Sequence, residues 1–155
     1  MKLDKNIVRF LARQGIVIVS SYDRSGSIHC AVKGIVGIEE DGAVFVIDLY
    51  KAHTYKNLMS DPRVSITAVD EEKFTGWTLQ GKAKIVQRQD IAAHIQAKWE
   101  EKIVNRISSR LLKSLKKDRG AKHHFEAALP TIPQYLIEID IDNVIDLQPA
   151  CVRKT

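Results

Sequence analysis

Residues 43–70, AVFVIDLYKAHTYKNLMSDPRVSITAVD, contain the pattern that decides the fold. The hydrophobic run Val44–Asp48 predicts a buried strand, and Val64–Asp70 predicts a second one. A polar loop and a short helix separate them, and Asp61-Pro62-Arg63 ends the helix. A strand that leads into a helix start places free N–H groups and the positive end of the helix dipole together, which suits a phosphate.

The segment between these two strands is rich in side chains that donate hydrogen bonds to anions. The candidate phosphate ligands are Lys51, His53, Thr54 and Lys56. The alternative is that Thr54 caps the helix and that the cations are ordinary surface charges. On these residues alone, both interpretations stay open.

The rest of the first half of the chain predicts strands joined by short turns. The expected strands are Ile16–Ser21, Ile28–Ile38, Val44–Asp48, Val64–Asp70 and Trp77–Gln87. A short amphipathic helix over Ile7–Leu11 precedes them, and Asp23–Gly26 has the composition of a hairpin turn. Gly34 and Gly37 indicate a bend, a bulge or a close approach within the second strand. This pattern favours an antiparallel barrel or sandwich.

A helical segment over about 90–129 is expected before the last strand. Its apolar residues recur every four positions, which overshoots the 3.6-residue turn, so two helices with a break near Asn105–Ser109 are expected. Lys117–His124 is a charged connection, and Phe125–Leu129 predicts one further helical turn. Tyr135–Asp142 alternates as a strand does, and Val144–Leu147 continues it.

Composition indicates one soluble domain over residues 1–155. The net charge of +5 is compatible with an anionic partner. Cys30 and Cys151 have no zinc or disulfide spacing, which favours a reducing compartment. No apolar run is long enough for an export signal or a membrane span, so a cytoplasmic location without a membrane partner is expected.

Catalytic and metal motifs are absent from the sequence, and no general acid or base stands out, so the catalytic residues are unknown. Cys30 and the adjacent His29 point to opposite faces of a strand, and we expect a thiol packed in the core. The pair His123-His124 lacks a third ligand, so no metal site is expected. The basic run Lys98–Lys122 fits a solvated helix better than a nucleic-acid surface, because Trp99 alone could stack on bases.

Lys33 lies among apolar residues and glycines on the second strand. If its side chain points inward, it requires an anion, because burying an unpaired ammonium is unfavourable. If the strand lies at an edge, the side chain faces solvent. The sequence leaves both placements open.

Four pieces in order resemble the flavin-binding split-barrel family that includes pyridoxamine 5'-phosphate oxidase and small FMN-binding proteins. They lie within about Phe10–Val86: the first hairpin (GIVIVSSYDRSGSIHCAVKG), the strand, loop and helix (VFVIDLYKAHTYKNL), DPRVSI, and WTLQGKA. The resemblance implies a mainly β fold, a six-stranded antiparallel Greek-key split barrel with peripheral helices. It also implies a homodimer with FMN in the grooves between subunits.

The same resemblance implies which residues hold FMN. The phosphate would be held by Lys51, His53 and Thr54, helped by Lys33 and Lys56. The ring would lie along two strands, with the partner subunit closing the pocket. The residues that the resemblance assigns to these ring contacts are Val32, Lys33, Gly34, Ile47, Asp48, Leu49, Trp77 and Gln80.

The chain departs from the oxidases in two places. His53-Thr54 stands where they carry an Arg-Lys pair, and the C-terminal end LQPACVRKT lacks their substrate-binding motif. The expectation is therefore an FMN-dependent oxidoreductase with an unknown small-molecule substrate. The alternatives are a carrier or sensor that binds flavin, haem or a deazaflavin, and a nucleic-acid-binding protein that uses the basic helical segment.

Overall fold

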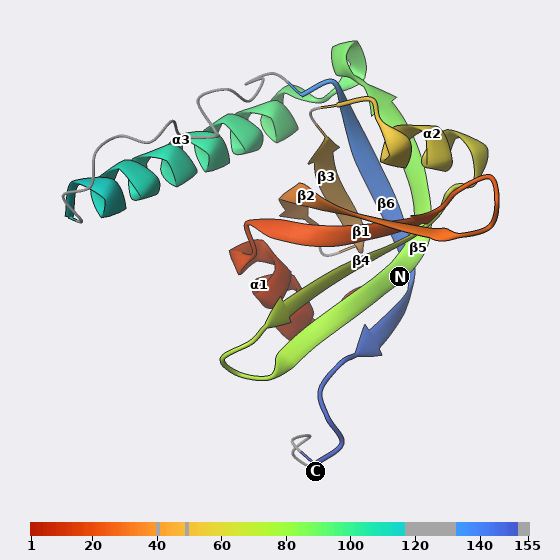
Figure 1. Cartoon of the computed structure of the whole chain (residues 1–155), viewed down its shortest axis with the longest axis horizontal. Helices are drawn as coiled ribbons and strands as arrows, with labels where there is room; N and C mark the ends of the chain where they lie inside the picture. The colour runs from red at the N-terminus through yellow and green to blue at the C-terminus, as the bar shows by residue number, and fades with distance from the viewer. Residues whose placement is uncertain (40, 49, 117–132, 152–155) are drawn as a thin grey trace.

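The chain forms a closed barrel of six antiparallel strands in the order β1-β2-β3-β6-β5-β4 (Figure 1). A computed structural model describes residues 1–39, 41–48, 50–116 and 133–151, without the side chains of 106–116. The strands are β1 (Ile16–Tyr22), β2 (Ile28–Ile38), β3 (Ala43–Asp48), β4 (Arg63–Asp70), β5 (Thr75–Gln87) and β6 (Tyr135–Asp146). Because β4 returns to lie beside β1, the order is that of a Greek key. The predicted antiparallel barrel is confirmed.

The helices lie outside the barrel. They are α1 (Lys5–Arg13), α2 (His53–Ser60) and α3 (Ala93–Lys116), with a 3₁₀ turn, η1 (Arg88–Asp90), before α3. The helix α2 lies across one end of the barrel, in the connection from β3 to β4 (Figure 1). None of the described helices is long and apolar enough to cross a bilayer.

Local turn chemistry sets the register of the first hairpin. The Asp23 carboxylate accepts hydrogen bonds from the backbone N–H groups of Ser25 and Ser27, at 2.8 and 2.9 Å. Gly26 adopts a φ of 83°, which a glycine reaches without strain. The predicted turn and returning strand are both confirmed. The pairing of β2 with β3 shifts register between Ile35 and Gly37, which is the irregularity that the glycines indicated.

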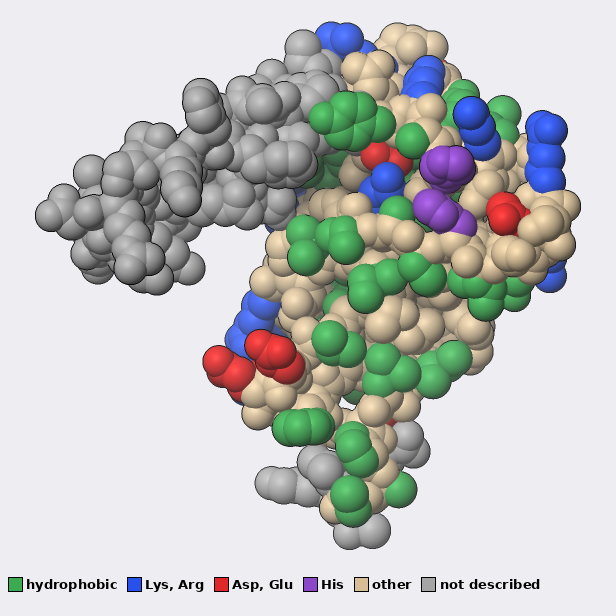
Figure 2. All heavy atoms as spheres, viewed as in Figure 1, with side chains coloured by type: hydrophobic (Ala, Val, Ile, Leu, Met, Phe, Trp, Pro, Cys, Tyr) green, Lys and Arg blue, Asp and Glu red, His purple; other side chains and the backbone are tan. Residues whose placement is uncertain are grey.

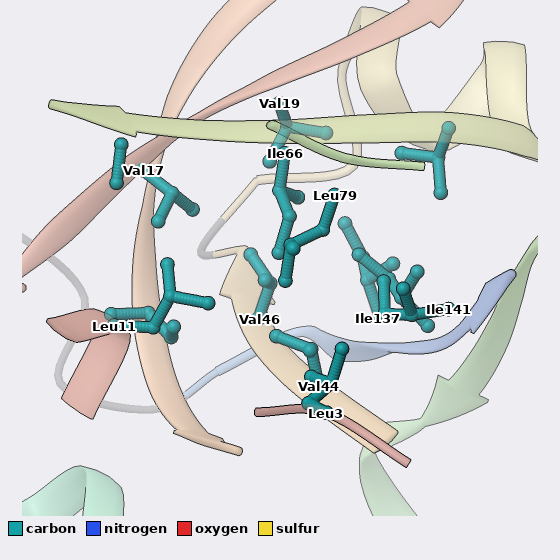
Figure 3. Close-up of a cluster of buried hydrophobic side chains, with 14 of the residues drawn as sticks. Leu3, Leu11, Val17, Val19, Val44, Val46, Ile66, Leu79, Ile137 and Ile141 are labelled. Carbon is teal, nitrogen blue, oxygen red and sulfur yellow. The ribbon is translucent and has the colours of Figure 1, made fainter. Parts of the chain in front are cut away.

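The barrel interior is filled by aliphatic side chains from every strand, together with α1 and residues before it (Figure 3). Alternation along each strand sends these side chains inward. Labelled members of this core are Leu3, Leu11, Val17, Val19, Val44, Val46, Ile66, Leu79, Ile137 and Ile141.

A single helix replaces the two helices expected in the next segment. The helix α3 runs without a break from Ala93 to Lys116 and projects away from the barrel (Figure 1). The expected break near Asn105–Ser109 is therefore wrong. It assumed that the whole apolar stripe must face one core, whereas the contacts described for α3 come from its first half. The segments expected over 117–124 and 125–129 lie outside the described residues.

Two outer surfaces of the barrel differ in what covers them. The covered wall consists of Val36, Ile47 and Leu136, which pack beneath Ile95 and Trp99 of α3. The open wall consists of the outward side chains of β1 and β2. Its members are Ile16, Ile18, Tyr22, Ile28, Cys30 and Val32, all of them exposed.

Cys30 belongs to the open wall, so the expectation of a core thiol is wrong. Its Sγ lies 3.4 Å from Oγ of Ser20, the residue opposite it on β1. In this part of β2 the outward face carries Ile28, Cys30 and Val32 and the inward face carries His29, Ala31 and Lys33, so hydrophobicity alone indicates the wrong face. The prediction that His29 and Cys30 point to opposite faces agrees with their alternating exposure.

Candidate functional site

A buried polar cluster lies where β2, β3 and β6 meet. Nζ of Lys33 lies 2.6 Å from Oδ2 of Asp48, and Tyr135 donates a 2.5 Å hydrogen bond to the same oxygen. The other carboxylate oxygen accepts a hydrogen bond from the backbone N–H of Tyr50 at 3.2 Å. The Lys33 side chain is 12% exposed and that of Asp48 is 3% exposed. Lys33 thus points inward, and the anion that it requires is supplied by its own chain.

The three groups of the cluster stabilise one another through their contacts with the Asp48 carboxylate. A buried carboxylate is unfavourable unless several donors satisfy it, and Asp48 has three. Burial, and then the hydrogen bond to Asp48, raise the pKa of Tyr135 far above its ordinary value of 10.0. Tyr135 therefore stays a neutral donor, and the ammonium of Lys33 is fixed in one position.

The start of α2 lies a few residues after Asp48 and presents unsatisfied donors. Its N-cap residue, Ala52, has no side chain that could accept from the first N–H groups, and no acidic residue lies in the first turn. Thr54 is 2% exposed, and its hydroxyl makes no hydrogen bond within the described part of the chain. Thr54 is not the N-cap, so the capping alternative does not apply. This end of α2 can receive an anion.

Cationic and aromatic side chains surround this helix start. The rings of His29 and His53 lie 5.3 Å apart between centroids, at 39°. The ammonium of Lys51 lies 5.3 Å from the ring centroid of Tyr55 and donates a 3.1 Å hydrogen bond to Oε1 of Gln87. Lys56 is exposed on α2. Figure 2 shows two neighbouring histidine side chains, with basic and acidic side chains close by on the same face.

Packing against the barrel fixes the position of α2. The Tyr55 ring meets the Tyr135 ring edge-on at 4.9 Å, so the helix touches the buried polar cluster directly. On the next turn, the Asn57 amide donates a 3.1 Å hydrogen bond to the Ser21 hydroxyl in a buried position. The anion-receiving end of the helix is therefore rigidly placed with respect to β1, β2 and β6.

The family model described as pyridoxamine 5'-phosphate oxidase matches residues 3–134. The chain belongs to this family. The resemblance noted in the sequence is thereby confirmed. No curated protein matches the sequence.

Solved structures of the same fold agree with this assignment. HupZ of Group A Streptococcus superposes with a TM-score of 0.62 at 16% identity, covering 94% of this chain and 95% of that one. A Clostridium acetobutylicum protein related to general stress protein 26, of the pyridoxinephosphate oxidase family, gives 0.58 at 10% identity, covering 97% and 100%. A protein described as an F420 reductase gives 0.58 at 11% identity, covering 92% and 98%.

The structure gathers only some of the residues that were expected to hold the cofactor of this oxidase family. Lys33 and Asp48 pair directly, and Lys51, His53, Thr54 and Lys56 follow closely around the start of α2. Leu49 lies outside the described residues. These positions lie along one stretch from the end of β3 to the start of α2, with Lys33 of β2 beside it.

Other predicted contacts lie elsewhere on the chain. Ile47 is buried beneath α3, and a Cβ added at Gly34 would lie 3.0 Å from Cζ3 of Trp99. Val32 faces outward on the open wall. Trp77 packs partly against the barrel core, and Gln80, on the outside of β5, accepts a 2.8 Å hydrogen bond from Asn143. Their role in cofactor binding stays a prediction.

A hollow of about 360 Å³ lies beside the open wall. Its lining includes Tyr22, Arg63, Ser65, Gln80 and Asp142, from β1, β4, β5 and β6. Within the described residues, no group of three or more His, Cys, Asp or Glu side chains is arranged to hold a metal ion.

Sequence reasoning missed two residues of this site, Tyr135 and His29. Tyr135 lies 87 positions from Asp48 along the chain, and only the closing of the barrel between β3 and β6 brings them together. The signal for His29 was its even spacing from Lys33, which places both residues on the same face of β2.

Proposed function

We propose that the protein is a cytoplasmic, homodimeric FMN-binding oxidoreductase that acts on a small-molecule substrate. The observation that carries the proposal is the start of α2. The Thr54 hydroxyl, which makes no hydrogen bond within the described residues, lies there with an N-cap that lacks a side-chain acceptor and with several cationic side chains nearby. A phosphate monoester is nearly dianionic at neutral pH and has three acceptor oxygens, which these donors can satisfy.

The residues present fit FMN. The phosphate would be held by the N–H groups of α2, the Thr54 hydroxyl, and the side chains of Lys51, His53 and Lys56. The ring would lie along the strand positions that the family resemblance assigns. FMN, when bound, supplies the hydride and electron transfer. The chain's own contribution is to orient the cofactor and, through the Lys33 ammonium that Asp48 and Tyr135 hold in place, to set the charge beside it.

Two features support the homodimer. The open wall exposes Ile18 to 43% and Val32 to 62%, directly opposite each other in the β1–β2 pair. Trp77 and Gln80, assigned to the cofactor pocket by the family resemblance, lie on β5 rather than beside α2. A second copy placed against the open wall would supply such residues to the site and bury the apolar surface.

The first experiment is a visible absorption spectrum of the purified protein, before and after addition of FMN and desalting. Retained bands near ~370 and ~450 nm are expected, because the cofactor carries the chromophore. A colourless protein that retains no added FMN would refute the proposal. Reduction of the bound flavin by NADH or NADPH, with turnover of an acceptor, would then separate an enzyme from a carrier.

The phosphate site has its own test. His53→Ala with Thr54→Ala should weaken FMN affinity about ten- to a thousand-fold, because charge-assisted hydrogen bonds to the phosphate are lost. Riboflavin, which lacks the phosphate, should bind both forms equally. His94→Ala, at an exposed position of α3, is the matched control. Unchanged FMN affinity in the double variant would place the phosphate elsewhere.

A second cofactor deserves the same assay. Because one structural neighbour is described as an F420 reductase, a deazaflavin is the next candidate for the same site. Retention of F420 in preference to FMN would support the same anion site but identify a deazaflavin as the redox cofactor. If neither is retained, haem is tested next, and then salt-sensitive binding of nucleic acid.

A further inference from the structure

The histidine pair beside α2 carries an inference that rests on the proposed FMN site. We propose that His29 is a second imidazole ligand of the cofactor phosphate, and that the pair formed with His53 takes up a proton when the phosphate binds. The site would then retain FMN more tightly at lower pH. His29 comes from β2, outside the strand, loop and helix that suggested the phosphate site.

The geometry places His29 at the phosphate position. It is half-buried on the same face of β2 as Lys33, while its neighbours Ile28 and Cys30 point outward. Its ring lies 5.3 Å from that of His53, the first residue of α2. Two rings at this separation, tilted by 39°, can each direct an N–H group to one anion from different sides.

A second observation points to a ligand at the same place. Thr54, next to His53, is 2% exposed as a residue, and its hydroxyl makes no hydrogen bond in the described part of the chain. No buried side-chain oxygen of the described residues lacks a partner, so this hydroxyl keeps some access to solvent and is open to a ligand. An oxygen of a phosphate at the start of α2 would satisfy this hydroxyl and the neighbouring N–H groups together.

The charges around the pair explain the coupling to protons. Neither imidazole forms an ion pair with a carboxylate among the described residues. The titratable and charged groups on the elements around the pair are Tyr22, Asp23, Lys33, Asp48, Tyr50, Lys51, Tyr55, Lys56, Lys82, Lys84 and Tyr135. Asp48 is already engaged by Lys33 and Tyr135, and Asp23 by its own hairpin turn.

Without an anion, charging both rings is unfavourable, because two imidazolium groups would repel each other and the lysines. A phosphate dianion reverses this balance, since it attracts both rings. Binding of the phosphate and binding of the proton therefore strengthen each other, and the coupling is reciprocal. At pH 6.5 about three-quarters of the phosphate is already a dianion, and its remaining titration would weaken binding at the lower pH, so tighter binding there reports the protein's groups.

The test measures FMN dissociation constants by fluorescence quenching at pH 6.5 and 8.5, at constant ionic strength. The wild type should bind about tenfold more tightly at pH 6.5, and His29→Asn should reduce that ratio to about threefold or less, because Asn does not titrate. His94→Ala is the control and should match the wild type. Riboflavin should show no difference between the wild type and His29→Asn.

Calorimetric titration of the wild type in two buffers of different ionisation enthalpy supplies an independent readout. Net proton uptake on binding of FMN at pH 7.5 is expected, together with its reduction in His53→Asn, which changes an exposed position and should fold. If FMN binds but affinity is independent of pH and no proton is taken up, the inference is wrong and the FMN site stands. If the wild type binds neither FMN nor riboflavin, the proposed function fails and this inference fails with it.

Discussion

The two outer walls of the barrel carry similar apolar residues, but α3 covers only one of them. On the covered wall, Val36, Ile47 and Leu136 are sealed by Ile95 and Trp99, and Trp99 is only 4% exposed. On the open wall, Ile16, Ile18 and Val32 face outward from β1 and β2, and no described segment lies over them.

The difference shows which apolar surface the chain buries with its own residues. A helix that follows β5 closes one wall with its first turns, while the neighbouring surface on β1 and β2 keeps several isoleucine and valine side chains exposed. Burial of apolar surface stabilises at roughly 25 cal/mol per Å². The open wall is therefore the surface that the proposed homodimer would bury, and the substitutions below test the two walls separately.

The largest effect is expected at the centre of the covered wall. Trp99→Ala should lower the free energy of unfolding by about 3–5 kcal/mol, because it removes a large buried ring and leaves a cavity above Gly34. Urea denaturation measures this loss. Trp99→Phe should recover part of the stability, and His94→Ala, on the exposed side of the same helix, should change it little. A loss below about 1 kcal/mol for Trp99→Ala would show that α3 does not seal this wall.

Substitutions on the open wall should weaken self-association of the protein. Ile18→Asp with Val32→Asp should raise the dissociation constant of the homodimer at least about 100-fold, near 2.7 kcal/mol, because charges at opposite positions would be buried in the interface. Sedimentation velocity over a range of concentrations measures this change. Val104→Asp, at an exposed apolar position of α3, should leave the dimer intact. A wild type that is monomeric at all concentrations would contradict the role given to this wall.

The buried cluster of Lys33, Asp48 and Tyr135 lies on the inward side of the strands that carry the two walls, and it predicts a pH dependence of stability. Tyr135→Phe should lower the free energy of unfolding by about 1.5–3 kcal/mol at pH 7, because a buried carboxylate loses a donor. The folded-state pKa of Tyr135 is raised, so its contribution is complete below pH 10.0 and declines as pH rises beyond that value.

Unfolding measurements from pH 8 to 11 check the direction. The stability difference between the wild type and Tyr135→Phe should narrow by up to about 1.4 kcal/mol for each pH unit above 10. A difference that stays constant over this range would mean that Tyr135 titrates alike in the folded and unfolded chains.

The smallest effect is expected where α3 is tied to β2. Nζ of Lys102 donates a 2.9 Å hydrogen bond to the backbone oxygen of Ile35. Lys102→Met keeps most of the aliphatic chain and should cost about 1 kcal/mol of stability. Lys98→Met, at an exposed position one turn earlier, is the control. An equal effect of the two substitutions would assign the loss to net charge instead of this contact.

Most of the fold could be predicted because its signals are local. Two-residue alternation and turn chemistry predicted every strand to within a few residues, since both act between close neighbours in sequence. The continuity of α3 could not be predicted in this way. A stripe that drifts around a helix requires a break only if the whole helix packs on one surface, and the sequence does not reveal how far α3 projects from the barrel.

The candidate site was predicted in part for the same reason. Lys51, His53, Thr54 and Lys56 lie close together in sequence, so the helix start was visible as a unit. The pairing of Lys33 with Asp48 and Tyr135 depends on the register of β2, β3 and β6, which no local pattern supplies. The sequence showed only that an inward lysine requires an anion, and the closed barrel shows which carboxylate provides it.

Closure of the barrel also limits how copies of this chain can aggregate. Each of the six described strands is hydrogen-bonded to a neighbour on both sides over part of its length, so none of them lies wholly at an edge. Growth of fibrils by strand addition is therefore limited to short stretches paired on one side, such as residues 28–33 of β2, unless the barrel unfolds locally. Association of the folded protein mainly through side-chain faces favours small closed assemblies over open-ended ones.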